Sequence, residues 1–201
     1  MIKHPRGHRG KSNQIHYTTA NLYHDQFTFH SGSFNTIEID SGTSLEHSSI
    51  TFKGSNNRVT IGKEGFINGL DIVLEGDNNA VVIGENAFVL GDMRMYAVDS
   101  SAINIGNDCM FSDRIEIRTT DNHAIIDRET GKRINFEENV VIGNHVWIGT
   151  GATILKGAKI ANGCIVGAKS LITRKHLEEH SIIAGHPGTV IRRNITWTME
   201  R

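Results

Sequence analysis

The chain has 201 residues and a formal net charge of −1, which is enough length for one domain with a substantial core. Because acidic and basic residues balance, electrostatics give no case for nucleic-acid binding. The 21 Gly residues suit a chain with many tight corners, and no apolar run is long enough to span a membrane.

The first residues and the two cysteines indicate the cellular compartment. The start, MIKHPRGHRG, is not followed by the apolar stretch of a signal peptide. Cys109 and Cys164 fall on positions that the repeats described below turn inward, so we interpret them as small core residues without a disulfide. These features predict a reducing compartment, the cytoplasm.

Residues 1–26 are polar and show no period, so we predict an N-terminal cap or arm there, followed by one solenoid domain over 27–201. From 27 to 118 similar residues recur every 22 positions, as stacked coils of a solenoid would require. The predicted inward rows are Ile39, Ile61, Ile83, Ile105; Ile37, Val59, Val81, Ile103; Leu45, Ile67, Val89, Phe111; and Phe29, Thr51, Val73, Met95, Ile117. Asn56, Asn57, Asn78 and Asn79 recur in the same register and are predicted to be structural corner residues.

A shorter period of six organises residues 140–173, which read VVIGNHVWIGTGATILKGAKIANGCIVGAKSLIT. Six residues fit neither the period of a helix nor simple strand alternation. They are typical of a hexapeptide solenoid, in which three short strands complete one triangular coil. The predicted inward rows are Ile142, Ile148, Ile154, Ile160, Val166, Ile172 and Val140, Val146, Ala152, Ala158, Cys164, Ser170.

Both periods stop in the polar segment 119–139, which we predict to be a loop inserted at one corner of the solenoid. After residue 173 the repeat ends and a C-terminal extension, 174–201, begins. We interpret RKHLEEH, residues 174–180, as a short helical turn and residues 181–184 as one more strand followed by a turn. Trp197 is expected to pack on the side of the solenoid or on a neighbouring subunit.

Three side chains stand out as candidates for chemistry. His145 and Trp147 alternate with inward residues and therefore face outward, where a Trp marks either a subunit interface or a ligand surface. His123 lies in the inserted loop, where it is either a general base or a solvated histidine. Asp121 and Asp127 are candidates to orient its ring.

The sequence gives little support for a metal site or for the common nucleophile and nucleotide-binding motifs. A zinc site between subunits requires about three converging ligands, and His123 and His145 are the only histidines near the coils in question, so we expect no metal. The sequence holds no Gly-x-Ser-x-Gly motif, no P-loop and no dinucleotide fingerprint.

The run from Asp108 to Trp197 resembles the hexapeptide-repeat acetyltransferases that use acetyl-CoA, above all the O-acetyltransferases of bacterial capsular polysaccharide, including those that act on sialic-acid capsules. The resemblance covers nearly half of the chain, in the family's order. It is carried by EIRTTDNHAIID, ETGKRIN, VVIGNHVWIGTGATILKGAKI, IVGAKSLIT and IIAGHPGTVIRRNITW. Departures from the family pattern occur at Lys169 and at His186, Pro187 and Gly188, along the expected path of CoA.

The resemblance implies an all-β, left-handed parallel β-helix that forms a homotrimer with active sites between neighbours. It implies that His123, the last residue of TTDNH, is the catalytic base, and that Trp147 lies by the acetyl-CoA and the acceptor. We also predict that Asp121 and His145 contact the acceptor. The residues implied to line the CoA groove are Trp147, Gly149, Thr150, Ala168, Arg174 and Lys175.

The sequence therefore predicts an O-acetyltransferase that moves an acetyl group from acetyl-CoA to a sugar hydroxyl of a surface polysaccharide or its precursor. Direct attack in a ternary complex is expected, because Cys109 and Cys164 face inward and no other nucleophile is positioned. The alternatives are a sugar N-acetyltransferase, a metal-dependent hydratase and a non-catalytic glycan-binding solenoid on the same scaffold.

Overall fold

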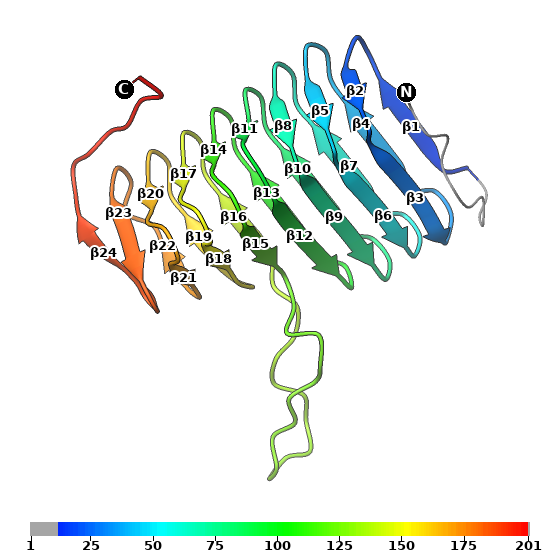
Figure 1. Cartoon of the computed structure of the whole chain (residues 1–201). Helices are drawn as coiled ribbons and strands as arrows, with labels where there is room; N and C mark the ends of the chain where they lie inside the picture. Colours follow the sequence, from blue (N-terminus) through cyan, green and yellow to red (C-terminus); the bar gives the residue numbers. More distant parts are fainter. Residues whose placement is uncertain (1–11, 201) are drawn as a thin grey trace.

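The computed structural model describes residues 12–200, and these residues form strands, turns and loops without a helix. Strands β1 to β23 wind into a parallel β-helix of triangular cross-section, with one sheet on each side, and β24 pairs antiparallel with β23 (Figure 1). No helix that could cross a membrane occurs among residues 12–200.

Up to β23, each of the three sheets takes every third strand of the chain, and β24 extends the second sheet. The first sheet consists of β1 (Gln14–Tyr17), β4 (Thr36–Ile39), β7 (Arg58–Ile61), β10 (Ala80–Ile83), β13 (Ala102–Ile105), β16 (Val140–Ile142), β19 (Lys159–Ile160) and β22 (Lys175–His176). The second consists of β2 (Asn21–Tyr23), β5 (Ser44–Glu46), β8 (Phe66–Asn68), β11 (Phe88–Val89), β14 (Met110–Phe111), β17 (Trp147–Ile148), β20 (Ile165–Val166), β23 (Ile182–Gly185) and β24 (Gly188–Arg192). The third consists of β3 (Gln26–Ser31), β6 (Ser49–Lys53), β9 (Leu70–Glu75), β12 (Met93–Val98), β15 (Ile115–Arg118), β18 (Thr153–Ile154) and β21 (Leu171–Ile172).

The two predicted hexad rows are confirmed, because each of their members is at most 2% exposed. Their strands pair in parallel with neighbours three strands away, as when Ile148 lies beside Val166. Each buried Ile side chain contributes about 1.5–3 kcal/mol through removal of apolar surface from water. Cys109 and Cys164 are buried as free thiols within this core, as predicted.

The period of 22 is confirmed on the first two sheets, where Ile39 pairs with Ile61 and Leu45 with Ile67. On the third sheet the predicted row through Thr51 and Val73 is wrong. Phe29 pairs with Phe52 there, one residue further along than a period of 22 requires. Because side chains alternate between faces, this one-residue extension turns Thr51 and Val73 outward.

A ladder of buried asparagines stabilises one corner, as predicted for Asn57 and Asn79. The Asn57 side chain donates to the Gly76 carbonyl at 3.0 Å and accepts from the Asn79 backbone N–H at 2.8 Å. Asn56 and Asn78, which precede them, adopt φ angles of 57° and 59°, a region that Asn tolerates better than most residues. These residues therefore hold successive coils together.

The solenoid starts earlier and ends later than the sequence predicts. β1 and β2 pair with β4 and β5, so residues 14–23 belong to the first coil, while the rest of the predicted cap, residues 1–11, lies outside the described residues. At the other end, Lys175 and His176 form β22 beside β19 instead of a helical turn, because the coil geometry is continued there. The predicted strand and turn after residue 181 are present as the antiparallel β23–β24 hairpin.

Candidate active site

The inserted loop leaves the solenoid after β15 and returns at β16, and it projects from one edge of the prism (Figure 1). Asn135, which is only 8% exposed, holds together the part of the loop nearest the solenoid. The Asn135 side chain accepts a hydrogen bond from the Ile125 N–H at 2.6 Å and donates to the His123 carbonyl at 2.9 Å. The backbone of His123 is therefore fixed, while its side chain is exposed.

Asp121 ties the loop to the coils. Its carboxylate lies 2.6 Å from the Lys156 Nζ and accepts from the Asn135 Nδ2 at 2.9 Å. The hydrogen bond from Lys156, followed by that from Asn135, lowers the pKa of Asp121 below its usual value. Lys156 also donates to the Phe136 carbonyl at 3.0 Å, so one cation holds both sides of the loop.

The predicted role of Asp121 and Asp127 in orienting the His123 ring is not seen in this protomer. Asp121 is engaged with Lys156 and Asn135, as described above. Asp127 closes a turn in the loop, where its carboxylate accepts from Thr130. Within residues 12–200, the His123 ring has no hydrogen-bond partner, because both carboxylates serve the loop's own structure.

His145 and Trp147 lie where the chain passes from the first sheet into the second, and they face outward as predicted. The His145 ring stacks on the Trp197 ring with centroids 4.2 Å apart. The Trp197 Nε1 donates to the His145 carbonyl at 2.9 Å, and Trp147 lies at 6.2 Å from Trp197 between centroids. Trp197 is 7% exposed. The chain's own C-terminal extension therefore covers part of the outward surface that His145 and Trp147 form.

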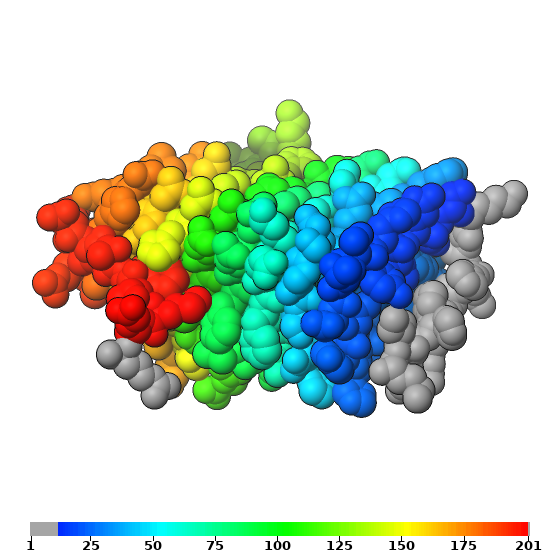
Figure 2. Space-filling view, turned by 90° about the horizontal axis from the view of Figure 1, so that it is seen from above, coloured from blue at the N-terminus to red at the C-terminus, as the bar shows by residue number. Residues whose placement is uncertain are grey.

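Figure 2 shows this extension lying against the side of the later coils. The expectation that Trp197 packs on the solenoid is therefore confirmed. Sequence reasoning did not connect Trp197 with His145, because the two residues are far apart in the chain and the extension has no repeat register.

The predicted CoA-groove residues occupy two different corners. Gly149 and Ala168 are in close contact between the second and third sheets, since a Cβ on Gly149 would lie 2.7 Å from the Ala168 nitrogen. Thr150 accepts a hydrogen bond there from the Lys169 N–H at 2.8 Å. Arg174 and Lys175 are exposed at the corner between β21 and β22, which joins the third sheet to the first.

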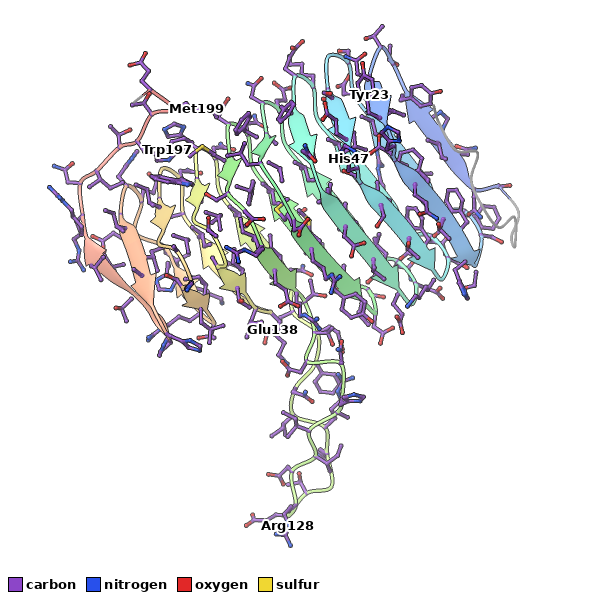
Figure 3. All side chains as sticks on the ribbon, in the orientation of Figure 1. Tyr23, His47, Arg128, Glu138, Trp197 and Met199 are labelled. Atoms are coloured by element: carbon purple, nitrogen blue, oxygen red, sulfur yellow. The ribbon has the colours of Figure 1, made fainter. Side chains whose placement is uncertain are left out.

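Within one protomer, the structure places His123 at the same corner of the prism as Arg174 and Lys175 but away from Trp147. His123 follows β15 on the loop at the corner between the third and first sheets, whereas Trp147 begins β17 in the second sheet. In Figure 3 the loop, marked by Glu138 and Arg128, leaves one edge of the prism, and Trp197 lies near the opposite edge. A site that uses both residues therefore requires a second copy of the chain.

Asn135 and Lys156 are the residues of this site that sequence reasoning missed. Both belong to polar or repeat-like stretches in which nothing distinguishes a structural side chain from a solvated one. Their role becomes visible only when the two ends of the loop are seen side by side.

Comparison with known proteins gives a consistent result. Residues 139–174 match the family model described as bacterial transferase hexapeptide (six repeats). A polysialic acid O-acetyltransferase of Neisseria meningitidis is 36% identical over 90 residues, which are 45% of this chain and 42% of that protein. The chain thus aligns with less than half the length of this curated relative.

Two solved structures match almost the whole chain. The crystal structure of polysialic acid O-acetyltransferase OatWY superposes with a TM-score of 0.90 at 31% identity, covering 97% of this chain and 93% of that one. The polySia-specific acetyltransferase NeuO gives a TM-score of 0.88 at 28% identity, over 95% of this chain and 80% of that one.

The fold is therefore the left-handed parallel β-helix of the hexapeptide transferases. Within that class, the chain belongs to the acetyltransferase family that includes the polysialic acid O-acetyltransferases.

Proposed function

We propose that this protein transfers an acetyl group from acetyl-CoA to a hydroxyl group of a bacterial surface polysaccharide or its precursor. The observation that carries the proposal is the match to OatWY over almost the full length of both chains, together with an exposed histidine on the inserted loop. The cytoplasm is the proposed location, on the basis of the two buried free thiols.

In the proposed reaction, His123 removes the proton of the acceptor hydroxyl as its oxygen attacks the thioester carbonyl carbon of acetyl-CoA. The carbon–sulfur bond then breaks, and the CoA sulfur takes up the proton from the imidazolium. General-base catalysis of this kind contributes about 10²–10⁴-fold to the rate. Backbone N–H groups in the groove stabilise the oxyanion, and no acyl-enzyme forms because both cysteines are buried.

Trp147, Gly149, Thr150, Ala168, Arg174 and Lys175 remain our proposed contacts for acetyl-CoA, and Asp121 and His145 those for the acceptor. Ala168 is exposed and Thr150 is partly exposed at their corner, which supports contacts with a ligand there, whereas Gly149 is buried beneath Ala168. Arg174 and Lys175 are exposed and form no ion pair within residues 12–200, which leaves both cations available to phosphates.

We also propose a homotrimer with cyclic symmetry. His123 lies at the corner between the third and first sheets and Trp147 in the second sheet, so a heterologous interface would bring the loop of one copy to the groove of the next. The loop carries large apolar side chains that are more than half exposed and would gain a partner in such an assembly. These are Ile125, Ile126, Ile134 and Phe136.

Acetyl transfer from labelled acetyl-CoA to a panel of acidic, neutral and amino sugars tests the proposal. We expect label on hydroxyl oxygens, and label confined to amines would favour the N-acetyltransferase alternative. His123→Ala should lower kcat by at least about a hundredfold without loss of folding, since the side chain is exposed and supports no core row. His30→Ala, a substitution of another exposed histidine, is the matched control and should leave kcat unchanged.

His145→Ala should reduce turnover less and act more on binding, because the ring is stacked on Trp197. If His145→Ala abolishes turnover while His123→Ala retains most of it, the assignment of the base is wrong.

A further inference from the structure

Lys156 lies at the corner of the solenoid from which the inserted loop leaves. The loop connects β15 with β16, and Lys156 follows β18, the strand that pairs with β15 on the next coil. Both of these corners join the third sheet to the first. The hexapeptide coils therefore supply a cation at the place where the loop begins and ends.

A chain of contacts connects Lys156 with the backbone of His123. The Lys156 Nζ lies 2.6 Å from the Asp121 Oδ2, and the same oxygen accepts from the Asn135 Nδ2 at 2.9 Å. That amide also donates to the His123 carbonyl at 2.9 Å, while the His123 N–H donates to the Asp121 carbonyl at 2.8 Å. Both backbone groups of His123 are thus held by residues that depend on Lys156.

The returning side of the loop is held by the same cation. The Lys156 Nζ donates to the Phe136 carbonyl at 3.0 Å, and close by the Glu138 N–H donates to the Thr119 carbonyl at 3.0 Å. Figure 3 shows Glu138 at the end of the loop nearest the coils. Because only 16% of the Lys156 side chain is exposed, solvent screens its ion pair less than one on the open surface.

Arg174 occupies the equivalent corner one coil later, between β21 and β22, so Lys156 could instead belong with it to a phosphate-binding column. The surroundings of the two cations differ. Arg174 is exposed and forms no ion pair within residues 12–200, whereas the charge of Lys156 is used by Asp121 and its side chain is largely covered. The contacts therefore favour a role for Lys156 toward the loop over one toward CoA.

We propose that Lys156 is a positioning residue, which holds the loop where the His123 imidazole can reach the acceptor hydroxyl. It acts through Asp121 and Asn135 and touches neither substrate. The inference rests on the proposed function and adds to it the residue that sets the place of the base. The Asp121 Oδ1 has no hydrogen-bond partner within residues 12–200, so Asp121 can serve the loop through Oδ2 and still contact an acceptor.

The test compares Lys156→Met with Lys159→Met, its matched control. Lys159 is an exposed lysine on β19 of the same coil and forms no ion pair within the described part of the chain. Hydrogen exchange of the His123 and Ile125 amides measures the hold on the loop without any substrate, since both amides are hydrogen-bonded there. Steady-state kinetics then separates kcat from the KM for acetyl-CoA, and thermal melts verify folding.

We expect Lys156→Met to speed exchange of these two amides at least about tenfold, since hydrogen bonds to charged groups are the strong ones. Its kcat should fall at least about tenfold, because a displaced base loses its alignment, while the KM for acetyl-CoA stays unchanged. Lys159→Met should match the wild type in all three measurements. Unchanged exchange and kcat with a raised KM would overturn the inference and assign Lys156 to the CoA phosphates.

Asp121→Asn breaks the same ion pair from the loop side and is compared by exchange alone, because Asp121 is a proposed acceptor contact. If Lys156 acts through Asp121, the double variant Lys156→Met/Asp121→Asn should exchange little faster than the single variants. Multiplying effects in the double variant would contradict this route.

The positioning role and the proposed function fail in different ways. If the wild type acetylates sugars but Lys156→Met keeps its kcat, the positioning role is wrong and the proposed function stands. If Lys156→Met loosens the loop yet the wild type transfers acetyl to no sugar, the proposed function is wrong and the hold of Lys156 on the loop stands.

Discussion

Asp25 is a buried carboxyl group whose environment opposes its ionisation. It is 4% exposed, and its Oδ1 accepts from the Ser48 N–H at 2.9 Å. Its Oδ2 has no hydrogen-bond partner within residues 12–200. Burial raises the pKa of Asp25 from 3.8 to about 6, against the opposing effects of the Ser48 and Tyr23 backbone hydrogen bonds.

This raised pKa predicts a loss of stability as the pH rises. Below pH 3.8 the group is protonated in both states; between there and about pH 6 the unfolded chain releases the proton while the folded chain keeps it. The shift in pKa corresponds to roughly 3 kcal/mol of folding stability, and this stability is lost in full once the pH exceeds the folded-state pKa.

Asp25→Asn keeps the Ser48 acceptor without the charge, so it should stabilise the protein by about 1–3 kcal/mol near pH 8 and hardly at all near pH 3.5. Urea unfolding at the two pH values measures both numbers. An equal effect at both would show that the carboxyl charge is not the cause.

A second prediction concerns Arg174 and Lys175, the proposed contacts for the CoA phosphates. The Arg174→Ala/Lys175→Ala variant should raise the KM for acetyl-CoA about tenfold with little change in kcat, because phosphates bind cations in ground state and transition state alike. Lys63→Ala, on an early coil, is the control and should leave this KM unchanged. An unchanged KM in the double variant would show that residues other than Arg174 and Lys175 bind the CoA phosphates.

The asparagine ladder is the element in which polar groups hold the coils together. Asn57→Ala removes the partner of the Asn79 N–H, of the Asn79 side chain and of the Gly76 carbonyl. The Asn79 N–H and the partly buried Gly76 carbonyl would lose these hydrogen bonds, and the Asn79 side chain would keep only its bond to the Glu75 carbonyl, so we expect a loss of about 1–3 kcal/mol in the free energy of unfolding. Chemical denaturation measures this loss.

Asn104→Ala is the matched control, since Asn104 faces outward on β13 and forms no side-chain hydrogen bond within the described residues. It should change stability by less than about 0.5 kcal/mol. Equal effects of the two substitutions would show that the asparagine ladder does not specifically stabilise the coils.

Elements with a repeat were predictable, and elements without one were not. The hexads specify their inward rows because each strand is followed by a corner of constant length. On the third sheet the corners vary by one residue, which is why a fixed period of 22 placed Thr51 on the wrong face. The start of the coil at β1 was missed although Ile15 lies 22 residues before Ile37, because Leu22 lies 23 residues before Leu45 and so leaves the register of its row.

At the site, sequence reasoning identified His123, His145 and Trp147 as outward candidates, but not their surroundings. The stacking of His145 on Trp197 and the hold of Asn135 on the loop depend on contacts between segments that share no period. Such contacts depend on the tertiary structure alone, so no local sequence pattern predicts them.

For the whole molecule, the central fact is that His123 and Trp147 lie on different sides of one protomer. If the active site combines the loop of one copy with the groove of the next, two differently inactivated chains should complement each other. In the proposed trimer, chains carrying His123→Ala and chains carrying Trp147→Ala would each lack one side chain at every site of their own assemblies.

Acetyl transfer by mixed trimers of these two variants tests the account most directly. At equal amounts and random assembly, about one site in four receives an intact loop from one chain and an intact groove from the next. We therefore predict that co-expression restores about a quarter of the wild-type activity per site, far above either parent. Mixed trimers no more active than their parents would contradict an active site shared between protomers.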